Sequence, residues 1–167
     1  MKQSLKLPSL DLLQELFTLD SKSGKLYWKT SPAHQIKVGT EAGYKNIAGY
    51  KVVTIKGQAY LVHRIIWFMF KGTQPLLDID HIDGNKINNT PANLRDVSRT
   101  VNRQNIKKAP KNNSTGLLGT TLLKGGKFQA SINVNGKCLY LGRHDTAQKA
   151  HKAYLEAKRK YHPGCTI

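Results

Sequence analysis

Apolar residues fall at helical or at strand spacing in short, separate blocks along this chain, and the blocks predict an α+β fold. The first block shows helical spacing, because Leu10, Leu13 and Leu16 recur every three residues behind Ser9, a good N-cap residue. Up to residue 106 the pattern predicts a helix over 8–17, a strand over 26–28, a hairpin over 50–62, a helix over 63–70, strands over 76–81 and 94–97, and a helix from 98 or 100 to about 106.

A polar, basic segment over residues 107–113 interrupts the pattern, and we place a domain boundary there. Strands are then predicted over 116–121, 128–134 and 137–141, with Asn135-Gly136 as the tight turn between the last two. A helix over 146–161 follows, with one face made by Ala147, Ala150, Tyr154, Ala157 and Tyr161. By strand alternation, Phe128, Ala130, Ile132 and Val134 would face this helix, whereas Lys127, Gln129, Ser131 and Asn133 would face outward.

The charge of the chain narrows the choice of partner. Its 167 residues carry 27 basic and 10 acidic side chains, a net charge of +17. From residue 102 onward there are 13 basic and 2 acidic residues, a net of +11, against +6 for residues 1–101. Such an excess repels itself unless a polyanion is near, which favours nucleic acid. An anionic membrane is the weaker alternative, because no basic helix with a broad apolar face is visible.

The cysteines and the apolar runs indicate a compartment. Cys138 and Cys165 form neither a CxxC pair nor a zinc-finger spacing, which favours a reducing environment without disulfides. The first five residues lack the apolar core of a signal peptide, and the longest apolar run, residues 65–70, is too short to span a bilayer. We therefore expect a soluble cytoplasmic protein, with no membrane partner.

The most informative block is Asp80-His81, which ends an apolar run and precedes a loop rich in Gly and Asn. An unperturbed imidazole titrates near ~6.5 and can take a proton from water at neutral pH. A carboxylate supplies hard oxygen ligands for a divalent cation, and the amide oxygen of Asn102 could close a metal site from the following helix. Strand alternation would point Asp80 and His81 to opposite faces, so a strand end or a bulge is needed for both to reach one phosphate.

Five blocks, in order, resemble phage and homing-type HNH endonucleases over about residues 48–106; they are residues 63–67, 80–85, 88–89, 91–95 and 98–105. The resemblance implies a ββα-metal nuclease in which His81 is the general base and Asp80 a metal ligand. By the same resemblance, Asn93 is the structural residue that pins the loop between the two strands. Asn102 would be the second ligand, at a position where many members have His; Asn there resembles the homing nickases.

The residues around Asp80-His81 are interpreted as structural rather than catalytic. Asp83 and Asn85 are best explained as loop formers that bond to the backbone. Asn88, Asn89 and Asn105 are interpreted first as polar loop or helix residues and only second as DNA contacts. His63 is interpreted as a satisfied packing histidine, and Trp67 and Phe68 as core residues.

Residues 113–162 resemble the plant Apetala-two (ethylene-response-factor) DNA-binding domain, on the blocks around Gly116, Phe128, Asn135-Gly136 and Tyr140. The resemblance implies a three-stranded antiparallel sheet laid in the major groove with one helix behind it. The expected DNA contacts are Lys124, Lys127, Gln129, Ser131, Asn133, Lys137, Tyr140 and Arg143. Leu117 and Leu118 depart from the family, which has an aromatic residue and then Arg.

The sequence therefore predicts a monomeric, Mg²⁺- or Mn²⁺-dependent endonuclease for double-stranded DNA, located in the host cell cytoplasm if it is phage-encoded, with no protein partner. Its parts would be an extension over 1–47, an HNH nuclease over 48–106, a linker over 107–113 and a DNA-binding domain over 114–167. In the extension, Lys37 and Lys45, with Lys51 after it, would contact phosphates. Two alternatives stay open: a catalytically inactive HNH-fold protein that regulates or blocks, and an RNA-directed protein.

Overall fold

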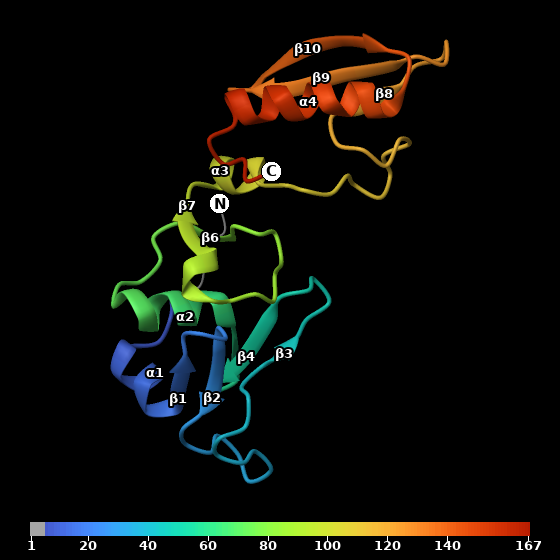
Figure 1. The fold of residues 1–167 in the computed structure, drawn as a ribbon. Helices are drawn as coiled ribbons and strands as arrows, with labels where there is room; N and C mark the ends of the chain where they lie inside the picture. The colour runs from blue at the N-terminus through green and yellow to red at the C-terminus, as the bar shows by residue number, and fades with distance from the viewer. Residues whose placement is uncertain (1–5) are drawn as a thin grey trace. The chain divides into compact units, whose positions relative to one another are not determined.

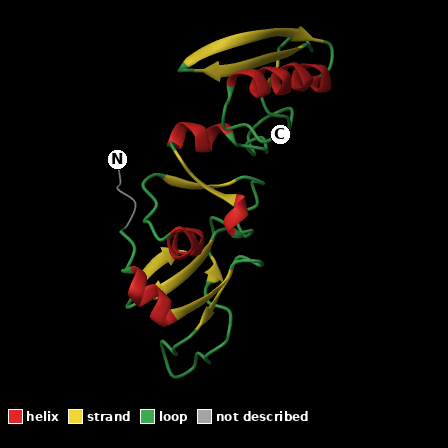
Figure 2. Cartoon of the chain, turned by 60° about the vertical axis from the view of Figure 1, so that its left-hand side comes forward, coloured by secondary structure: helices red, strands yellow, loops and turns green. Residues whose placement is uncertain are grey.

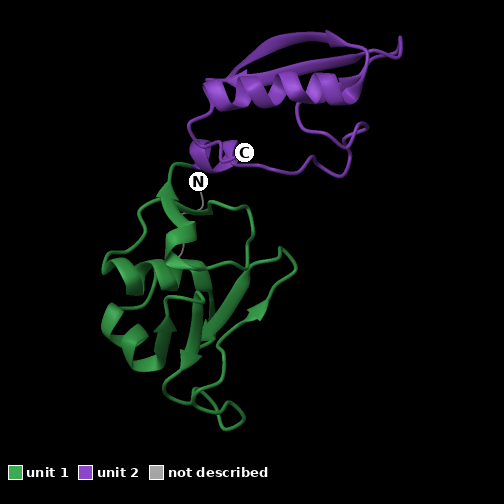
Figure 3. Cartoon of the chain, viewed as in Figure 1, with its two compact units in different colours: residues 1–98 green, residues 99–167 purple. Residues whose placement is uncertain are grey.

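The computed structural model describes residues 6–167, so the prediction for the first five residues lies outside the described part. Single helices separate runs of short strands along the chain (Figure 1), and long loops connect several of these elements (Figure 2). The chain divides into two compact units, residues 1–98 and residues 99–167 (Figure 3). The predicted linker over residues 107–113 lies within the second unit and contains no helix or strand. Among the described residues, no helix has the length and apolar character needed to cross a lipid bilayer.

The first unit begins with helix α1 (Leu10–Leu16), whose Ser9 cap accepts a hydrogen bond from the Leu12 amide at 3.3 Å, as predicted. The helix is one residue shorter than predicted at its C-terminal end, because Phe17 starts a strand that the sequence analysis missed. Strand β1 (Phe17–Asp20) pairs antiparallel with β2 (Lys25–Trp28). Phe17 pairs with Trp28, and their ring centroids lie 4.7 Å apart, so aromatic packing fixes the end of the helix.

The predicted hairpin is confirmed as β4 (Lys51–Ile55) and β5 (Gln58–Leu61), joined by Lys56 and Gly57 with φ of 48° and 78°. A short strand β3 (Tyr44–Lys45), which the sequence analysis left as loop, adds to the edge of β4. Helix α2 (Val62–Lys71) follows directly and ends at Gly72, whose left-handed φ of 71° suits glycine, as predicted.

The apolar core of the first unit forms around α2 and β4. Its buried members include Leu13, Phe17, Leu26, Trp28, Val53, Ile55, Val62, Ile65, Ile66, Phe68, Ile79 and Leu94. Phe68 lies in this core as predicted, and Trp67 packs at its border. Ile79 and Leu94 come from β6 (Asp78–His81) and β7 (Leu94–Val97), an antiparallel pair linked through the 3₁₀ turn η1 (Pro91–Asn93). The core thus anchors both strands of the hairpin that carries Asp80 and His81.

The second unit contains helix α3 (Arg99–Gln104), a sheet of order β10-β9-β8, and helix α4 (Ala147–Tyr161). Strand β9 (Phe128–Val134) has the predicted bounds, and Asn135 and Gly136 adopt the positive φ values, 50° and 80°, of the predicted tight turn. Strand β8 (Thr120–Leu122) starts later than predicted. Gly119 just before it lies against the Tyr154 ring, where an added Cβ would sit 1.9 Å from that ring.

Strand β10 (Lys137–His144) runs three residues past its predicted end, through a register shift between Tyr140 and Arg143. Helix α4 packs on the face of the sheet that carries Ala130 and Ile132, both buried, as the alternation predicts. Ala150 and Ala157 of the helix are buried, whereas Tyr161 is 37% exposed. Tyr161 is the last residue of the helix.

The C-terminal tail holds helix α3 within the second unit. The Gly164 amide donates to Gln104 Oε1 at 3.1 Å, and the Thr166 hydroxyl donates to Asn105 Oδ1 at 2.6 Å. Lys158 of α4 is 1% exposed and donates to the Ile106 carbonyl. These bonds satisfy polar groups at the end of α3, and they make α3 part of the same unit as the sheet.

Candidate active site

Asp80 and His81 lie at the C-terminal end of β6, where His81 is the last residue of the strand. The pairing of β6 with β7 shows no register shift, so a strand end and not a bulge is the local irregularity at this point. A turn begins at once, because the Gly84 amide donates to the His81 carbonyl at 2.8 Å. Both side chains are buried, Asp80 being 7% and His81 4% exposed. The end of the strand thus carries a buried carboxylate and a buried imidazole at consecutive positions.

Asn89 fixes the imidazole of His81. The distance between His81 Nε2 and Asn89 Oδ1 is 2.9 Å, and Asn89 is only 1% exposed. An amide oxygen can only accept a hydrogen bond, so Nε2 carries the proton and Nδ1 of the neutral ring keeps its lone pair. This is the tautomer in which Nδ1 can act as a base. The sequence analysis treated Asn89 as a loop residue, since no spacing rule links it to His81.

Arg95 holds the carboxylate of Asp80. The two residues face each other across β6 and β7, and Arg95 Nε and Nη2 lie 2.9 and 2.8 Å from Asp80 Oδ2. Two hydrogen bonds from the planar guanidinium fix the position of this carboxylate oxygen. Arg95 belongs to one of the blocks recognised in the sequence, but the sequence analysis gave it no role, because the pair forms only through the strand register.

Asn93 ties together the loop between the two strands. Its Nδ2 donates to Asp83 Oδ1 at 2.9 Å and to the Asn88 carbonyl at 2.8 Å, and its Oδ1 accepts from the Asp83 amide at 3.0 Å. Asp83 also accepts from Asn88 Nδ2 at 2.7 Å. Slight burial would raise the pKa of Asp83, but the bonds from Asn88, the Asn85 amide and Asn93 outweigh it and lower that pKa. Asp83 and Asn88 therefore serve the loop itself.

A cluster of rings lies beside His81. The His63 ring meets it edge to face, with centroids 5.0 Å apart and planes at 78°, and the Tyr50 ring lies 5.4 Å from His63 and 6.1 Å from His81. Lys86 places its ammonium 4.5 Å from the centre of the Tyr50 ring. His63 is buried, as expected of a packing histidine. It is not fully satisfied, however, because its Nδ1 has no hydrogen-bond partner among the described residues.

Arg64, next to His63, supports the start of β6. The buried guanidinium donates from Nη1 to the Leu77 carbonyl at 2.9 Å and from Nη2 to the Pro75 carbonyl at 3.3 Å. From the other side, the Asp96 carboxylate accepts from the amides of Leu76 and Leu77 at 2.7 and 2.8 Å. The segment that leads into Asp80 and His81 is thus fixed by charged groups on α2 and β7.

The proposed second ligand belongs to the other unit. Asn102 is on α3 of the second unit, so the structure does not bring it together with Asp80 and His81 inside one unit. Within residues 6–167, no group of three or more His, Cys, Asp or Glu side chains could hold a metal ion. The donors that the sequence offers are one carboxylate and one amide oxygen. Such hard oxygen donors suit Mg²⁺ or Mn²⁺, which keep several waters, and do not suit a zinc cage.

The sheet of the second unit gathers most of the predicted DNA contacts on one face. Arg143 pairs with Gln129, Tyr140 with Ser131 and Cys138 with Asn133, so these side chains share the face opposite α4. The sequence analysis missed two members of this face, Cys138 and Thr121. The three predicted lysines differ from the rest: Lys124 lies in the turn before β9, Lys127 forms an ion pair with Asp145, and Lys137 pairs with Val134 on the other face.

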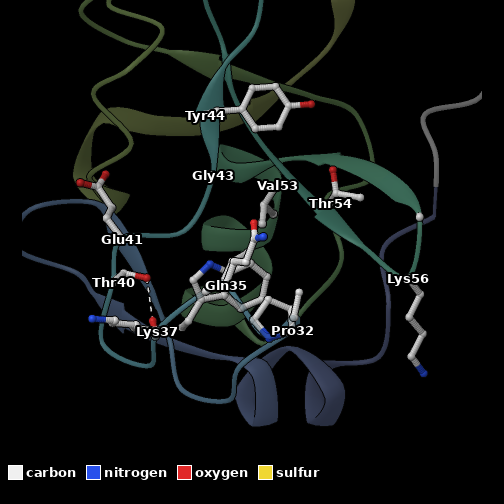
Figure 4. A pocket seen from close by; sticks show the side chains of 14 residues that line it. Pro32, Gln35, Lys37, Thr40, Glu41, Gly43, Tyr44, Val53, Thr54 and Lys56 are labelled. Atoms are coloured by element: carbon white, nitrogen blue, oxygen red, sulfur yellow. Dashed lines mark hydrogen bonds between the residues drawn. The ribbon is translucent and has the colours of Figure 1, made fainter.

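A hollow of about 740 Å³ lies in the first unit between the loop after β2 and the β4–β5 turn (Figure 4). Pro32, Gln35 and Lys37 line it from the loop, and Val53 and Lys56 from the hairpin. None of the predicted active-site residues lines it. Glu41 at its border pairs with Lys25 and Lys51. Lys51, one of three lysines expected to contact phosphates, therefore already has a partner.

The β6–β7 hairpin lies in a segment that is similar to known endonucleases. A family model described as "HNH endonuclease" matches residues 60–104, which include Asp80, His81 and Asn102. The DNA endonuclease I-HmuI of Bacillus phage SP01 is 39% identical over 85 residues, which is 50% of this chain and 43% of the relative. A solved structure, "DNA binding and cleavage by the HNH homing endonuclease I-HmuI", is 26% identical with a TM-score of 0.44, covering 60% of this chain and 57% of the other.

The chain thus spans less than half the length of the curated relative that it matches. The match to the family model runs from the end of β5 to the end of α3. It includes all three residues that the sequence analysis assigned to base and metal. The likeness of residues 113–162 to the Apetala-two domain stays a prediction.

Proposed function

We propose that this protein is a divalent-metal-dependent endonuclease that hydrolyses phosphodiester bonds of double-stranded DNA, leaving 5′-phosphate and 3′-hydroxyl ends. The observation that carries the proposal is the buried imidazole of His81, held by Asn89 with Nδ1 as its basic atom, inside a segment that matches HNH endonucleases. The curated relative carries the name of a DNA endonuclease, which supports DNA as the substrate.

In the proposed reaction, Nδ1 of His81 takes one proton from a water molecule while the water oxygen attacks the phosphorus. A new P–O bond forms in line with the leaving group, the bond between phosphorus and the 3′ oxygen breaks, and the 3′ oxygen takes up a proton from solvent water to become the 3′-hydroxyl. Asn89 continues to accept from Nε2, so the ring stays in place as it becomes an imidazolium. The general base and the residue that orients it thus come from β6 and from the loop that follows it.

A bound divalent ion, Mg²⁺ or Mn²⁺, would neutralise the phosphate and stabilise charge on the leaving 3′ oxygen. Asp80 would hold it through a carboxylate oxygen, and Asn102 would supply an amide oxygen from α3. Arg95 keeps the Oδ2 atom of the Asp80 carboxylate in position through its two bonds to that oxygen. The positive charge of Arg95 at the same carboxylate also disfavours the binding of a divalent metal ion there.

The second unit would hold the DNA. Its sheet face presents Gln129, Ser131, Asn133 and Arg143, which suit base edges and phosphates. The residues from 102 onward carry a net charge of +11, which favours any polyanion along this unit. We propose that the protein binds DNA as a monomer, with this sheet in the major groove as in the Apetala-two domain.

A second function, DNA binding without cleavage, has one specific observation in its favour. Arg95 already pairs with the carboxylate that should receive the metal ion. If that pair does not yield to a divalent cation, the protein would bind DNA and act as a regulator or blocker. Binding would then be salt-sensitive and independent of metal.

Supercoiled plasmid incubated with the purified protein separates the two functions. A nuclease converts the plasmid to open-circle or linear DNA in the presence of Mg²⁺ or Mn²⁺ and is inactive in excess EDTA. End-mapping of the products shows whether one or both strands are cut, and at which site. Several plasmids of unrelated sequence should be tested, so that a range of possible target sites is covered. Retardation of every plasmid without conversion of any, in both ions, would contradict the nuclease and leave the binding protein.

A further inference from the structure

His63 stands out among the buried side chains that the proposed reaction does not use. It occupies the first turn of α2, is 4% exposed, and meets the His81 ring edge to face at 5.0 Å. Tyr50 lies against both histidines, at 5.4 and 6.1 Å between ring centroids. His63 therefore belongs to the wall of the site and not only to the core beneath it.

Core packing alone does not account for a histidine at this position. Nδ1 of His63 is buried and has no hydrogen-bond partner among the described residues. A buried polar atom without a partner destabilises the fold, whereas an apolar side chain would fill the same space without that loss. A cost to stability that persists beside a proposed active site is typical of a residue kept for function.

The His63 ring is also uncharged under any ordinary assay condition. Burial, together with the smaller effects of the nearby charges of His81 and Arg64, lowers the pKa of His63 to about 3. A neutral ring next to His81 does not repel the imidazolium that forms there when a proton is taken up. The contact between the rings is thus compatible with both protonation states of the proposed base.

The His81 imidazole has to be held at more than one place. The bond from Nε2 to Asn89 fixes one edge of the ring. A flat neighbour packed edge to face restricts the tilt of the ring, since such ring pairs have a preferred geometry. His63 and Tyr50 supply these flat neighbours from two other elements, α2 and the segment before β4.

We propose that His63 is a positioning residue whose flat ring holds His81 in the orientation and tautomer that present Nδ1 to the substrate water. This inference rests on the proposed nuclease function for its meaning, but its structural content is measured without DNA or metal. The readout is the tautomer of His81, from the ¹⁵N shifts of the labelled imidazole at pH 8 in the metal-free protein.

Two apolar substitutions form a matched pair. His63→Leu and His63→Phe both remove the unpaired nitrogen and both suit a core, so both should fold and melt no lower than the wild type. Only His63→Phe keeps a flat ring. We expect His81 to stay a single Nε2–H tautomer in His63→Phe and to become a mixture of tautomers in His63→Leu. In single-turnover cleavage, His63→Leu should lose about tenfold or more at unchanged DNA affinity, with most of the rate restored in His63→Phe.

Ile65→Val, a change at a fully buried residue of the same helix, is the control for altered packing and should leave the tautomer unchanged. A single Nε2–H tautomer in folded His63→Leu would overturn the inference, and so would equal disturbance by Ile65→Val. If the protein cuts no DNA but the tautomer responds as expected, the nuclease proposal fails while the contact between the rings is upheld.

Discussion

Two hairpins of this molecule, β6–β7 in the first unit and β9–β10 in the second, are built in opposite ways. The first buries its polar side chains: Asp80, His81 and Asn89 are all less than 8% exposed and each is bonded to another side chain. Its loop is tied by Asn93. The second hairpin closes in a two-residue turn and points its outward side chains to solvent, with Tyr140 56% exposed.

The two hairpins therefore suit different proposed tasks, catalysis in the first and DNA binding in the second. Proton transfer and metal binding depend on fixed positions, which need buried contacts and a shaped loop. Attraction of a phosphate backbone depends mainly on charge, which an open and exposed sheet provides. Changes in the first hairpin should therefore alter the rate of cleavage, and changes in the second should alter affinity.

The largest effect is expected from His81→Ala. Loss of the general base should lower single-turnover cleavage by about 10²- to 10⁴-fold, while DNA binding stays within about twofold of the wild type. A gel-shift titration beside the cleavage assay measures both. His34→Ala, at an exposed histidine in the loop after β2, is the matched control and should behave as wild type. Equal cleavage by His81→Ala would remove His81 from the role of base.

Asn89→Ala should have a smaller effect on the same rate. Without the amide oxygen, Nε2 of His81 loses its acceptor, so the ring populates both tautomers and cleavage falls by roughly 10- to 100-fold. Asn89→Asp restores an acceptor at the same place and should regain part of the rate. Asn85→Ala is the control, because among the described residues the Asn85 side chain bonds only to the Ile87 amide of its own loop. No difference between Asn89→Ala and Asn89→Asp would separate Asn89 from catalysis.

In the second hairpin, Arg143→Ala should weaken DNA binding by several-fold and reduce the slope of log affinity against log salt by about one. The rate at saturating protein should not change. Lys127→Ala is the matched control: Lys127 is already paired with Asp145, whose pKa is lowered by that contact, so its removal should cost less affinity. Fluorescence anisotropy at several salt concentrations measures both variants. A larger loss from Lys127→Ala than from Arg143→Ala would contradict the assignment of Arg143 as the stronger DNA contact.

The smallest effect concerns stability in acid and belongs to the first unit. The pKa of His63 is about 3 in the folded state and about 6.5 when unfolded. The unfolded state therefore binds more protons between these values, and the free energy of unfolding falls as the pH drops from about 6.5 toward 3. His81, Arg64 and Tyr50 are the other titratable groups facing His63.

From pH 7 to pH 5 the His63 contribution amounts to about 2 kcal/mol at most, since one pH unit corresponds to about 1.4 kcal/mol. His63→Phe should lose this part of the pH dependence, whereas His34→Ala should keep it. Urea unfolding at the two pH values, followed by Trp fluorescence of the first unit, measures the difference. Parallel pH dependence of wild type and His63→Phe would show that His63 is accessible to protons in the folded state.

Local patterns in the sequence predicted most of the elements. The Asn135-Gly136 turn, the Ser9 cap and the Gly72 end of α2 each rest on one residue whose conformation depends on its own chemistry. The errors came where distant contacts decide. Phe17 leaves the helix because Trp28 pairs with it, and β8 starts late because Gly119 lies against Tyr154. No local window contains both partners.

The candidate site follows the same rule. Asp80, His81 and Asn93 were found because their blocks stand in order along the chain. Asn89, Arg95 and His63 were given no active-site role, since their positions next to His81 and Asp80 arise from a folded loop, a strand register and a helix start. The place of Asn102 in the second unit, held by bonds from the C-terminal tail, was likewise not visible in any spacing.

The central claim, that the first hairpin cuts and the second one holds, is tested most directly by measuring cleavage rate and affinity on one labelled duplex for His81→Ala and Arg143→Ala together. The account predicts a crossed result: His81→Ala keeps its affinity and loses the saturating rate, and Arg143→Ala keeps the saturating rate and loses affinity. Loss of both properties in both variants, with folding intact, would contradict it.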